Sequence, residues 1–399
     1  MYYVLAILSL AFLIVVHEGG HFFVARWCKM KIERFSLGFG PGILKHTSKK
    51  SGTIFQLAPL PFGGFVEIRG MNIAEEVDPE DRFAYPNRPA WQRFVTIFAG
   101  PATNYLSAFV LALVLYQCHG VRSDYAFYGV NQTTAGYDAV GKLMPDDRIV
   151  AVDHKPIMAA GDYIAADGTQ FHADPNDSLH KRVKGANRIV LTVLRDGKPI
   201  DVAITPSIAR DKDGKASLED IEGTYCWRAV GLGDKDGYLA ELGVTRRIAN
   251  CQSEYKLLGI ELKVDVDYIH VGVLRASWEA LRYPVLQTKA IAAGLYGIIV
   301  GTEKADPGGP GRIVNEFSKA WKAGWLSGVE LLMMLSVYLG LFNLFPLPAL
   351  DGGRLVFLGY ELVTRRRANP KIEAMVHMSG IMVLGVVMIL VTLHDCHVL

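Results

Sequence analysis

The chain has 399 residues, of which 50% are apolar and 21% are charged, and its 42 Lys and Arg against 40 Asp and Glu give a formal net charge of +2. The apolar content excludes an intrinsically disordered protein, and the absence of a period excludes collagen-like and low-complexity classes. Because the net charge is close to zero, no global field favours a nucleic-acid partner, and we expect none.

The chain begins with an apolar segment. Residues 1–16 carry no charge, and apolar character resumes at 22–25 after the sequence HEGGH. A secretory signal peptide would have a basic start and a small-residue cleavage site, and this segment has neither. Residues 1–25 are long enough to cross a bilayer at about 1.5 Å per residue. We predict a retained membrane helix.

Three further segments have the apolar character of membrane spans, at 94–115, 325–344 and 375–393. With the first segment they predict a polytopic α-helical membrane protein with four transmembrane helices. Residues 118–275 differ from these segments, because they are charged, rich in Gly and Asp, and contain no long apolar run. We expect them to form an extramembrane domain.

Lysine and arginine are distributed unevenly between the segments that join the predicted spans, and cytoplasmic loops carry the excess of these residues. The N-terminal end and the tail after Val391 contain neither Lys nor Arg. We therefore predict that both termini and 118–275 lie outside the cytoplasm. The two basic, inner segments contain Arg26, Lys29, Lys31, Arg34, Lys45, Lys49, Lys50, Arg69, Arg82, Arg88 and Arg93, and then Arg354, Arg365, Arg366, Arg367 and Lys371.

The sequence His17-Glu18-Gly19-Gly20-His21 matches the HExxH pattern. Histidines at positions i and i+4 project from one face of a helix, so both imidazoles can bind one zinc ion, and the intervening Glu can act as general base toward the attacking water. The alternative is a helix end with two interfacial histidines. His and Glu inside an apolar span are energetically costly and typically functional, which favours the metal site.

A catalytic zinc takes three protein ligands and keeps one position open, so a third ligand has to come from elsewhere. The segment 343–353, NLFPLPALDGG, interrupts an apolar helix with two prolines and then presents Asp351. Broken backbone at membrane depth is tolerated where it lines a cavity or is buried in protein. Asp351 is therefore the candidate third ligand, and an Asp-Gly turn after a helix is the alternative.

The segment 280–300 is ambiguous between a span and an amphipathic helix at the membrane interface. Arg282, Pro284 and Lys289 favour the interfacial helix. The metal site favours the same answer, because a further crossing would carry Asp351 to the side of the membrane opposite the histidines. We predict an interfacial helix.

The sequence resembles the site-2 protease family. Within this family it resembles the bacterial regulator-of-sigma-E-protease (RseP) type, which is a zinc intramembrane protease. The motifs that carry the resemblance are HEGGH, SLGFGP at 36–41, GGFV at 63–66, Gly100-Pro101 with Asn104, and NLFPLPALDGG. The resemblance implies a Zn²⁺ cofactor, His17, His21 and Asp351 as its ligands, and Glu18 as the catalytic base. It also implies that Asn104 and Asn343 lie near substrate or the oxyanion, although hydrogen bonding between spans is an equal alternative.

Residues 51–70 alternate around Pro59, Pro61 and Gly63-Gly64, which predicts short strands with a tight turn. A transmembrane substrate helix has to unwind before hydrolysis, because its carbonyls are hydrogen-bonded within the helix. An edge strand near the zinc, at Gly63, Gly64 and Phe65, could bind the unwound segment by strand addition. The family carries a membrane-associated β-hairpin loop here, and an ordinary cytoplasmic hairpin is the alternative.

The predicted outer domain resembles a PDZ domain, an α+β module that binds peptides by strand addition. Residues 135–157 read as a small-residue helix, a turn and the strand IVAVD, and 188–206 as a hairpin around Asp196-Gly197. Two features depart from the family: an acidic insertion at 161–178, and a charged segment at 207–255, either a long PDZ insertion or a divergent second module. Cys226 and Cys251 would share the oxidising compartment, either paired or unpaired.

The motifs predict a zinc metalloendopeptidase with the zinc toward the cytoplasmic side of a membrane, and the resemblance implies that this is the bacterial inner membrane. The expected partners are the lipid bilayer and single-pass transmembrane substrates, such as an anti-sigma factor or remnant signal peptides. The alternative is a non-catalytic scaffold that binds peptides through its PDZ-like domain, and a zinc-dependent transporter is disfavoured. The predicted domains are an N-terminal membrane half (1–117), the PDZ-like domain (118–275), an interfacial helix with linker (276–324) and a C-terminal membrane half (325–399).

Overall fold

The chain folds into two units, Met1–Cys118 with Val271–Leu399, and His119–His270. Each is described by itself, and a computed structural model provides the coordinates. The residues that the structure describes are 1–72, 75–165, 170–174, 178–183, 186–206, 258–302 and 308–395.

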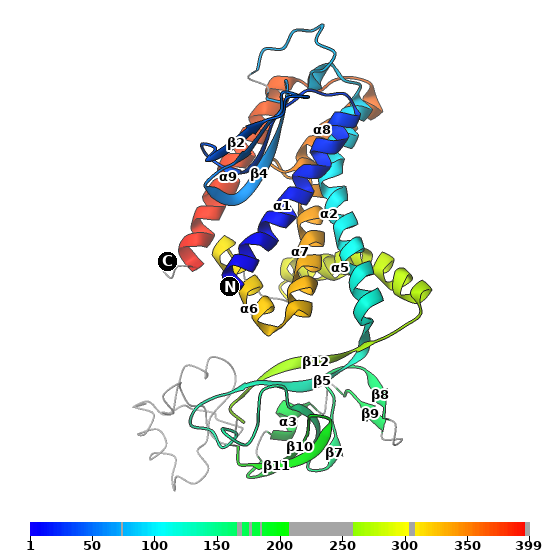
Figure 1. Ribbon diagram of the computed structural model, residues 1–399, viewed down its shortest axis with the longest axis vertical. Coiled ribbons are helices and arrows are strands. Elements are labelled where there is room, and N and C mark those ends of the chain that lie inside the picture. Colours follow the sequence, from blue (N-terminus) through cyan, green and yellow to red (C-terminus); the bar gives the residue numbers. More distant parts are fainter. Residues whose placement is uncertain are drawn as a thin grey trace. The chain divides into compact units, whose positions relative to one another are not determined.

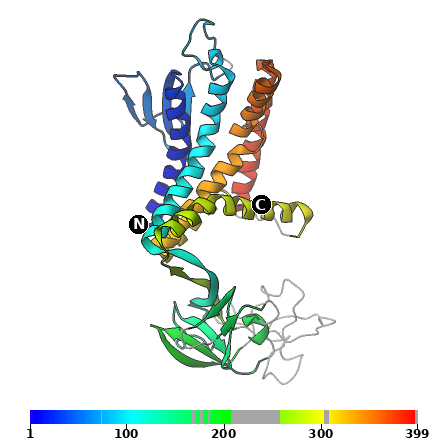
Figure 2. The same ribbon diagram turned by 90° about the vertical axis from the view of Figure 1, so that its right-hand side faces the viewer.

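The first unit contains the apolar helices. In Figures 1 and 2, α1 (Tyr2–Trp27), α2 (Ala90–His119) and α7 (Trp325–Leu344) run alongside one another. Within the described residues, five helices are long and apolar enough to cross a membrane: these three, α5 (Val273–Val300), and Lys371–Val391 of α9 (Pro370–Asp395). The protein is therefore a multi-pass helical membrane protein with β-sheet regions.

Helix α5 contains the segment that the sequence predicts to lie at the membrane interface. By length and composition it qualifies as a span, so the predicted count of four spans stays a prediction. Figures 1 and 2 show α5 running across the direction of α1, α2 and α7. Pro284 lies inside the helix, and Thr288 Oγ1 donates to its carbonyl at 2.8 Å.

Helix α6 (Pro310–Ala323) follows α5 in the region that the sequence assigned to a linker. Its Phe317 is fully buried in a cluster with Ala6 and Leu13 of α1, and its Trp321 donates from Nε1 to Ser9 Oγ at 3.0 Å. The start of α5 is bonded to the end of α2, because Gln117 Nε2 donates to the Val273 carbonyl at 3.1 Å.

A four-stranded sheet with the order β2-β3-β1-β4 follows α1. Its strands are β1 (Ile32–Phe39), β2 (Leu44–Thr47), β3 (Ile54–Leu57) and β4 (Leu60–Ile68). The short helix η1 (Tyr85–Asn87) precedes α2, and α8 (Asp351–Thr364) lies between α7 and α9.

The β-hairpin predicted in 51–70 is wrong, because its two strands do not pair with each other. β3 and β4 are not neighbours, because β1 lies between them, parallel to β3 and antiparallel to β4. The chain crosses at the end of β1, where Ala58 N–H donates to the Leu37 carbonyl at 2.8 Å. Gly38 makes room for this crossing: it has a φ of 91°, and a Cβ there would lie 2.7 Å from the Ala58 carbonyl oxygen.

The second unit is built on a six-stranded sheet in which β11-β10-β6-β5-β12 are consecutive neighbours and β7 pairs with β6. The strands are β5 (Val121–Thr133), β6 (Arg148–Val152), β7 (Lys155–Pro156), β10 (Ile189–Arg195), β11 (Lys198–Ile204) and β12 (Ile260–Ile269). The unit also contains α3 (Leu179–Val183) and a small sheet of β8 (Asp162–Ile164) and β9 (Gln170–His172). Its core is apolar, with Ile149, Leu191 and Val193 at 0% exposure.

The predicted strand IVAVD and the hairpin around Asp196-Gly197 are confirmed by β6 and by the antiparallel pairing of β10 with β11. The helix expected in 135–157 is wrong: residues 134–147 form turns, in which Gly136, Gly141 and Asp146 have positive φ. The PDZ assignment stays a prediction. The segment 207–255, and Cys226 and Cys251 with it, lies outside the described residues.

Candidate metal centre

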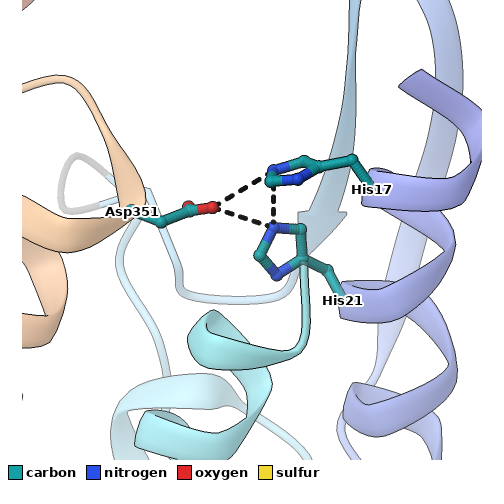
Figure 3. Close-up of side chains that lie close together, drawn as sticks. All are labelled: His17, His21 and Asp351. Atoms are coloured by element: carbon teal, nitrogen blue, oxygen red, sulfur yellow. Dashed lines mark hydrogen bonds and ion pairs between the residues drawn. The ribbon is translucent and has the colours of Figure 1, made fainter. Parts of the chain in front are cut away.

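Three side chains that are far apart in the sequence meet in the first unit. His17 and His21 lie one turn apart on α1, and Asp351 is the first residue of α8. Both imidazoles face Asp351 Oδ2 through Nε2 at 3.2 Å, and the two Nε2 atoms are 3.3 Å apart (Figure 3). One ligand atom from each residue lies within 4.8 Å of the others, so the structure brings together the three predicted ligands.

The segment between α7 and α8 positions Asp351 beside the two histidines. α7 ends at Leu344, and the prolines at 346 and 348 cannot donate the hydrogen bonds that a continuing helix needs. Helix α8 then begins against this segment. A Cβ on Gly352 would lie 2.1 Å from the Phe345 carbonyl oxygen, so only glycine fits after the aspartate. The sequence predicted this break and a position for Asp351 near the histidines, but not the helix that follows.

Helix α2 crosses α1 at the two histidines through a pair of glycines. A Cβ on Gly20 would lie 2.4 Å from the carbonyl oxygen of Ala99, and a Cβ on Gly100 would lie 2.2 Å from His21 Nε2. Small residues allow such close approach of helices. Gly100, which the sequence analysis named only as part of the Gly100-Pro101 motif, therefore lies directly against the histidines of this site.

Residues of α2 also contact the Nδ1 atom of each imidazole, on the ring edge opposite Nε2. His21 Nδ1 donates to the carbonyl oxygen of Thr96 at 2.8 Å, so in the neutral ring Nε2 is the unprotonated nitrogen, and it faces the cluster. His17 Nδ1 lies 3.1 Å from Nδ2 of Asn104. The Thr96 contact was missed by sequence reasoning, because a main-chain carbonyl has no residue-type signal. Asn104 was expected near substrate or the oxyanion; its side chain contacts His17, and its relation to substrate stays a prediction.

The three side chains suit a zinc ion. Two imidazole nitrogens and one carboxylate oxygen are a zinc donor set, and three protein ligands leave a fourth position for water or substrate. Oδ2 of Asp351 is buried with no hydrogen-bond donor other than the two imidazoles facing it among the described residues.

The strand β4 lies against α1 beside Glu18, at the edge of its sheet. A Cβ on Gly64 would lie 2.7 Å from Ile14 Cγ2 and 3.1 Å from Glu18 Cγ, so this approach requires glycine. Gly63 faces the ring of Phe39, and Phe65 stacks on the same ring at 6.4 Å between centroids. Gly64 is thus the member of the predicted substrate strand that contacts the proposed base.

Asn343 lies on the last turn of α7. Its side chain donates from Nδ2 to the Leu339 carbonyl one turn earlier in the same helix, at 2.9 Å. This bond satisfies one amide hydrogen locally and leaves the predicted contact with substrate untested.

The fold and the cluster together define a class, that of membrane proteins with a buried site for a catalytic metal. A sequence profile of peptidase family M50 matches residues 5–387, and the chain belongs to this family. Relatives that carry the name "Putative zinc metalloprotease" include one from Mesorhizobium japonicum, 30% identical over 94% of this chain and 92% of the relative. Others from Fusobacterium nucleatum and Rickettsia conorii are 27% and 26% identical over 99% and 98% of this chain and 98% and 96% of their own lengths.

Proposed function

We propose that the protein is a zinc-dependent intramembrane endopeptidase of the RseP type, which hydrolyses peptide bonds within transmembrane segments of other proteins. The observation that carries the proposal is the cluster of His17, His21 and Asp351 beside Glu18, because the two histidines and Glu18 lie on α1, a helix apolar enough to span a membrane. Such groups are costly inside a bilayer and mark a functional site there. A peptide-binding scaffold would have no use for them.

His17, His21 and Asp351 would hold the zinc ion. When bound, zinc would supply Lewis-acid polarisation of the scissile carbonyl and activation of water. Glu18, adjacent to His17 in the chain, would accept a proton from the attacking water and return it to the leaving amine. The side chain of Glu18 is only half-buried, which leaves it accessible to the reactants.

The substrate would bind as an extended strand along the free edge of β4. A strand that lies at the edge of a sheet has unpaired main-chain groups, and these can pair with an unwound segment. The position of Gly64 against Glu18 supports this arrangement, because a strand added there would run close to the base. Substrates of the proposed class include an anti-sigma factor and remnant signal peptides.

The packing of α6 supports the orientation that the basic loops predict. α5 begins beside the end of α2, and α6, which follows it, lies beside the N-terminal half of α1. α2 and α1 are antiparallel here, since Leu111 of α2 packs in the same cluster as Ala6 and Leu13. The chain therefore returns to the side it left, which favours four crossings and an interfacial α5. The basic loops, and not this packing, are the reason to place both termini outside the cytoplasm and the metal toward the cytoplasm.

The unit His119–His270 would be a PDZ-like domain that screens the outer part of a substrate. The five consecutive neighbouring strands and the closing hairpin of β10 and β11 support this. The open edges of such a sheet, at β11 and β12, are where a peptide strand could be added.

The variant Glu18→Gln tests the proposed function. It retains the shape of the side chain but cannot accept the proton, so we expect normal zinc content and a cleavage rate lower by about 10²–10⁴-fold. The assay is cleavage of a single-span substrate that is reconstituted with the purified protein in vesicles. The control is Glu279→Gln on α5, a half-buried carboxylate that pairs with Arg282 and is not part of the cluster. Normal cleavage by Glu18→Gln would disprove the mechanism.

A further inference from the structure

Asn104 occupies a position that the proposed reaction leaves unexplained. It lies on α2 with 0% exposure, so a polar side chain there needs a bonding partner. Its amide contacts Nδ1 of His17, on the ring edge opposite Nε2. Oδ1 of the same amide has no partner among the described residues. A side chain in this position reaches the metal ligand directly.

The protonation of the two imidazoles makes this contact significant. His17 and His21 both direct Nε2 at Asp351, so a metal would bind at Nε2 and the proton of each neutral ring would be on Nδ1. His21 already has an acceptor for that proton, the Thr96 carbonyl. Among the described residues, the only group within hydrogen-bonding distance of His17 Nδ1 is the Asn104 amide, at 3.1 Å.

Rotation of the Asn104 amide by a half-turn exchanges its two ends and brings Oδ1 next to His17 Nδ1. Because no other described group bonds the amide of Asn104, the half-turn breaks no second hydrogen bond. The main chain of the residue is fixed, since Ser336 Oγ of α7 donates to the Asn104 carbonyl at 3.0 Å. The backbone is thus held while the amide is free to present the end that His17 requires.

We propose that Asn104 is a positioning residue for the metal ligand His17, and that its amide oxygen accepts the Nδ1 proton and so directs the Nε2 lone pair at the metal. This inference rests on the proposed function for the identity of the metal. It assigns Asn104 a role different from substrate binding. Metal-binding histidines generally donate their other N–H to such an acceptor, and loss of the acceptor costs about 10–100-fold in metal affinity.

The test is the zinc affinity of the full-length protein in detergent, measured by competition with a chelator. Asn104→Leu has a similar volume but no acceptor, and we expect its zinc affinity to fall by about 10–100-fold. Asn104→Asp retains an acceptor oxygen and should bind zinc no more weakly than the unaltered protein. Tyr105→Phe is the matched control: it removes the adjacent hydrogen bond to Thr288 of α5 and should leave the affinity unchanged.

Each outcome decides the inference. Unchanged affinity in Asn104→Leu would overturn it, and so would a folded Asn104→Asp that loses zinc. A substrate-binding role predicts the opposite pattern, in which both variants bind zinc normally and Asn104→Asp, which lacks the amide donor, loses cleavage. If Asn104→Leu does not fold, Asn104→Asp decides through both readouts: normal zinc affinity with retained cleavage supports the inference, and lost zinc, or normal zinc with lost cleavage, overturns it. Failure of the unaltered protein to bind zinc would instead contradict the proposed function.

Discussion

The two units of the protein differ in what they bury. In the unit His119–His270 the described core is apolar, and Asp147 is its one buried polar or charged residue. The other unit buries eleven among its described residues: Ser9, His17, His21, Ser36, Thr53, Gln56, Arg93, Thr96, Asn104, Ser336 and His377. Burial of polar groups is costly unless they are hydrogen-bonded, so a concentration of buried polar groups indicates a functional site. If this interpretation is right, the two units should respond to mutation in different ways.

The largest expected effect is that of Gly100→Ala in the metal-binding unit. The added Cβ would lie 2.2 Å from His21 Nε2, so the imidazole has to move and the donor set is lost. We expect the zinc affinity and the cleavage rate to fall by more than about 100-fold, which is the upper end of the effect of losing a hydrogen-bond acceptor of a metal-binding histidine. Measurement of bound zinc per chain checks this.

The control for that variant is Gly359→Ala on α8, where a Cβ would meet nothing within 4 Å. Alanine is the better helix former by about 1 kcal/mol, so this variant should bind zinc normally and be no less stable. Equal zinc content in the two variants would show that the glycine crossing does not shape the site.

The second effect is on stability, in the other unit. Leu191 of β10 is fully buried, and Leu191→Ala should lower the free energy of unfolding of that unit by about 2–5 kcal/mol. Ile200→Ala, at a position 37% exposed on the adjacent strand, should change it by about 0.5 kcal/mol or less. Denaturant unfolding monitored by hydrogen exchange measures both, and loss of zinc from Leu191→Ala would remove the contrast between the units.

The smallest effect is a dependence of that stability on pH. Burial alone would raise the pKa of Asp147, but hydrogen bonds from Arg195 and from the Met144 N–H outweigh it and lower the pKa below its ordinary value. A lowered pKa in the folded state gives stability that is complete above the unfolded value and is lost as the pH falls toward the folded one. We therefore expect the melting temperature of this unit to fall below about pH 5. Asp147→Asn should reduce the slope, and an unchanged slope would contradict the assignment.

The sequence contained enough to predict which three side chains meet in the cluster, because their signals are local. The spacing of His17 and His21 depends only on helix geometry, and the prolines before Asp351 indicate a broken helix by themselves. The contacts of α2 could not be predicted in this way. Whether Asn104 contacts a histidine or a substrate depends on how α2 crosses α1, and that crossing is set by close packing at Gly20 and Gly100.

The sheets show the same limit. The hairpin of β10 and β11 was predictable because its two strands are joined by Asp196-Gly197, a dipeptide typical of tight turns. The insertion of β1 between β3 and β4 was not, because the pairing joins segments that local turn signals do not connect. Similarly, β12 pairs along β5, the first strand of the unit with its last, without a signal in either segment.

The most direct test of the central claim is zinc K-edge X-ray absorption on the purified protein, together with a count of metal per chain. We predict one zinc per chain with nitrogen and oxygen ligands only, at about 2.0–2.2 Å, and a loss of bound zinc in Asp351→Asn. A sulfur shell at about 2.3 Å would instead place the metal on cysteine. That result, or full zinc content in Asp351→Asn, would contradict the site described here.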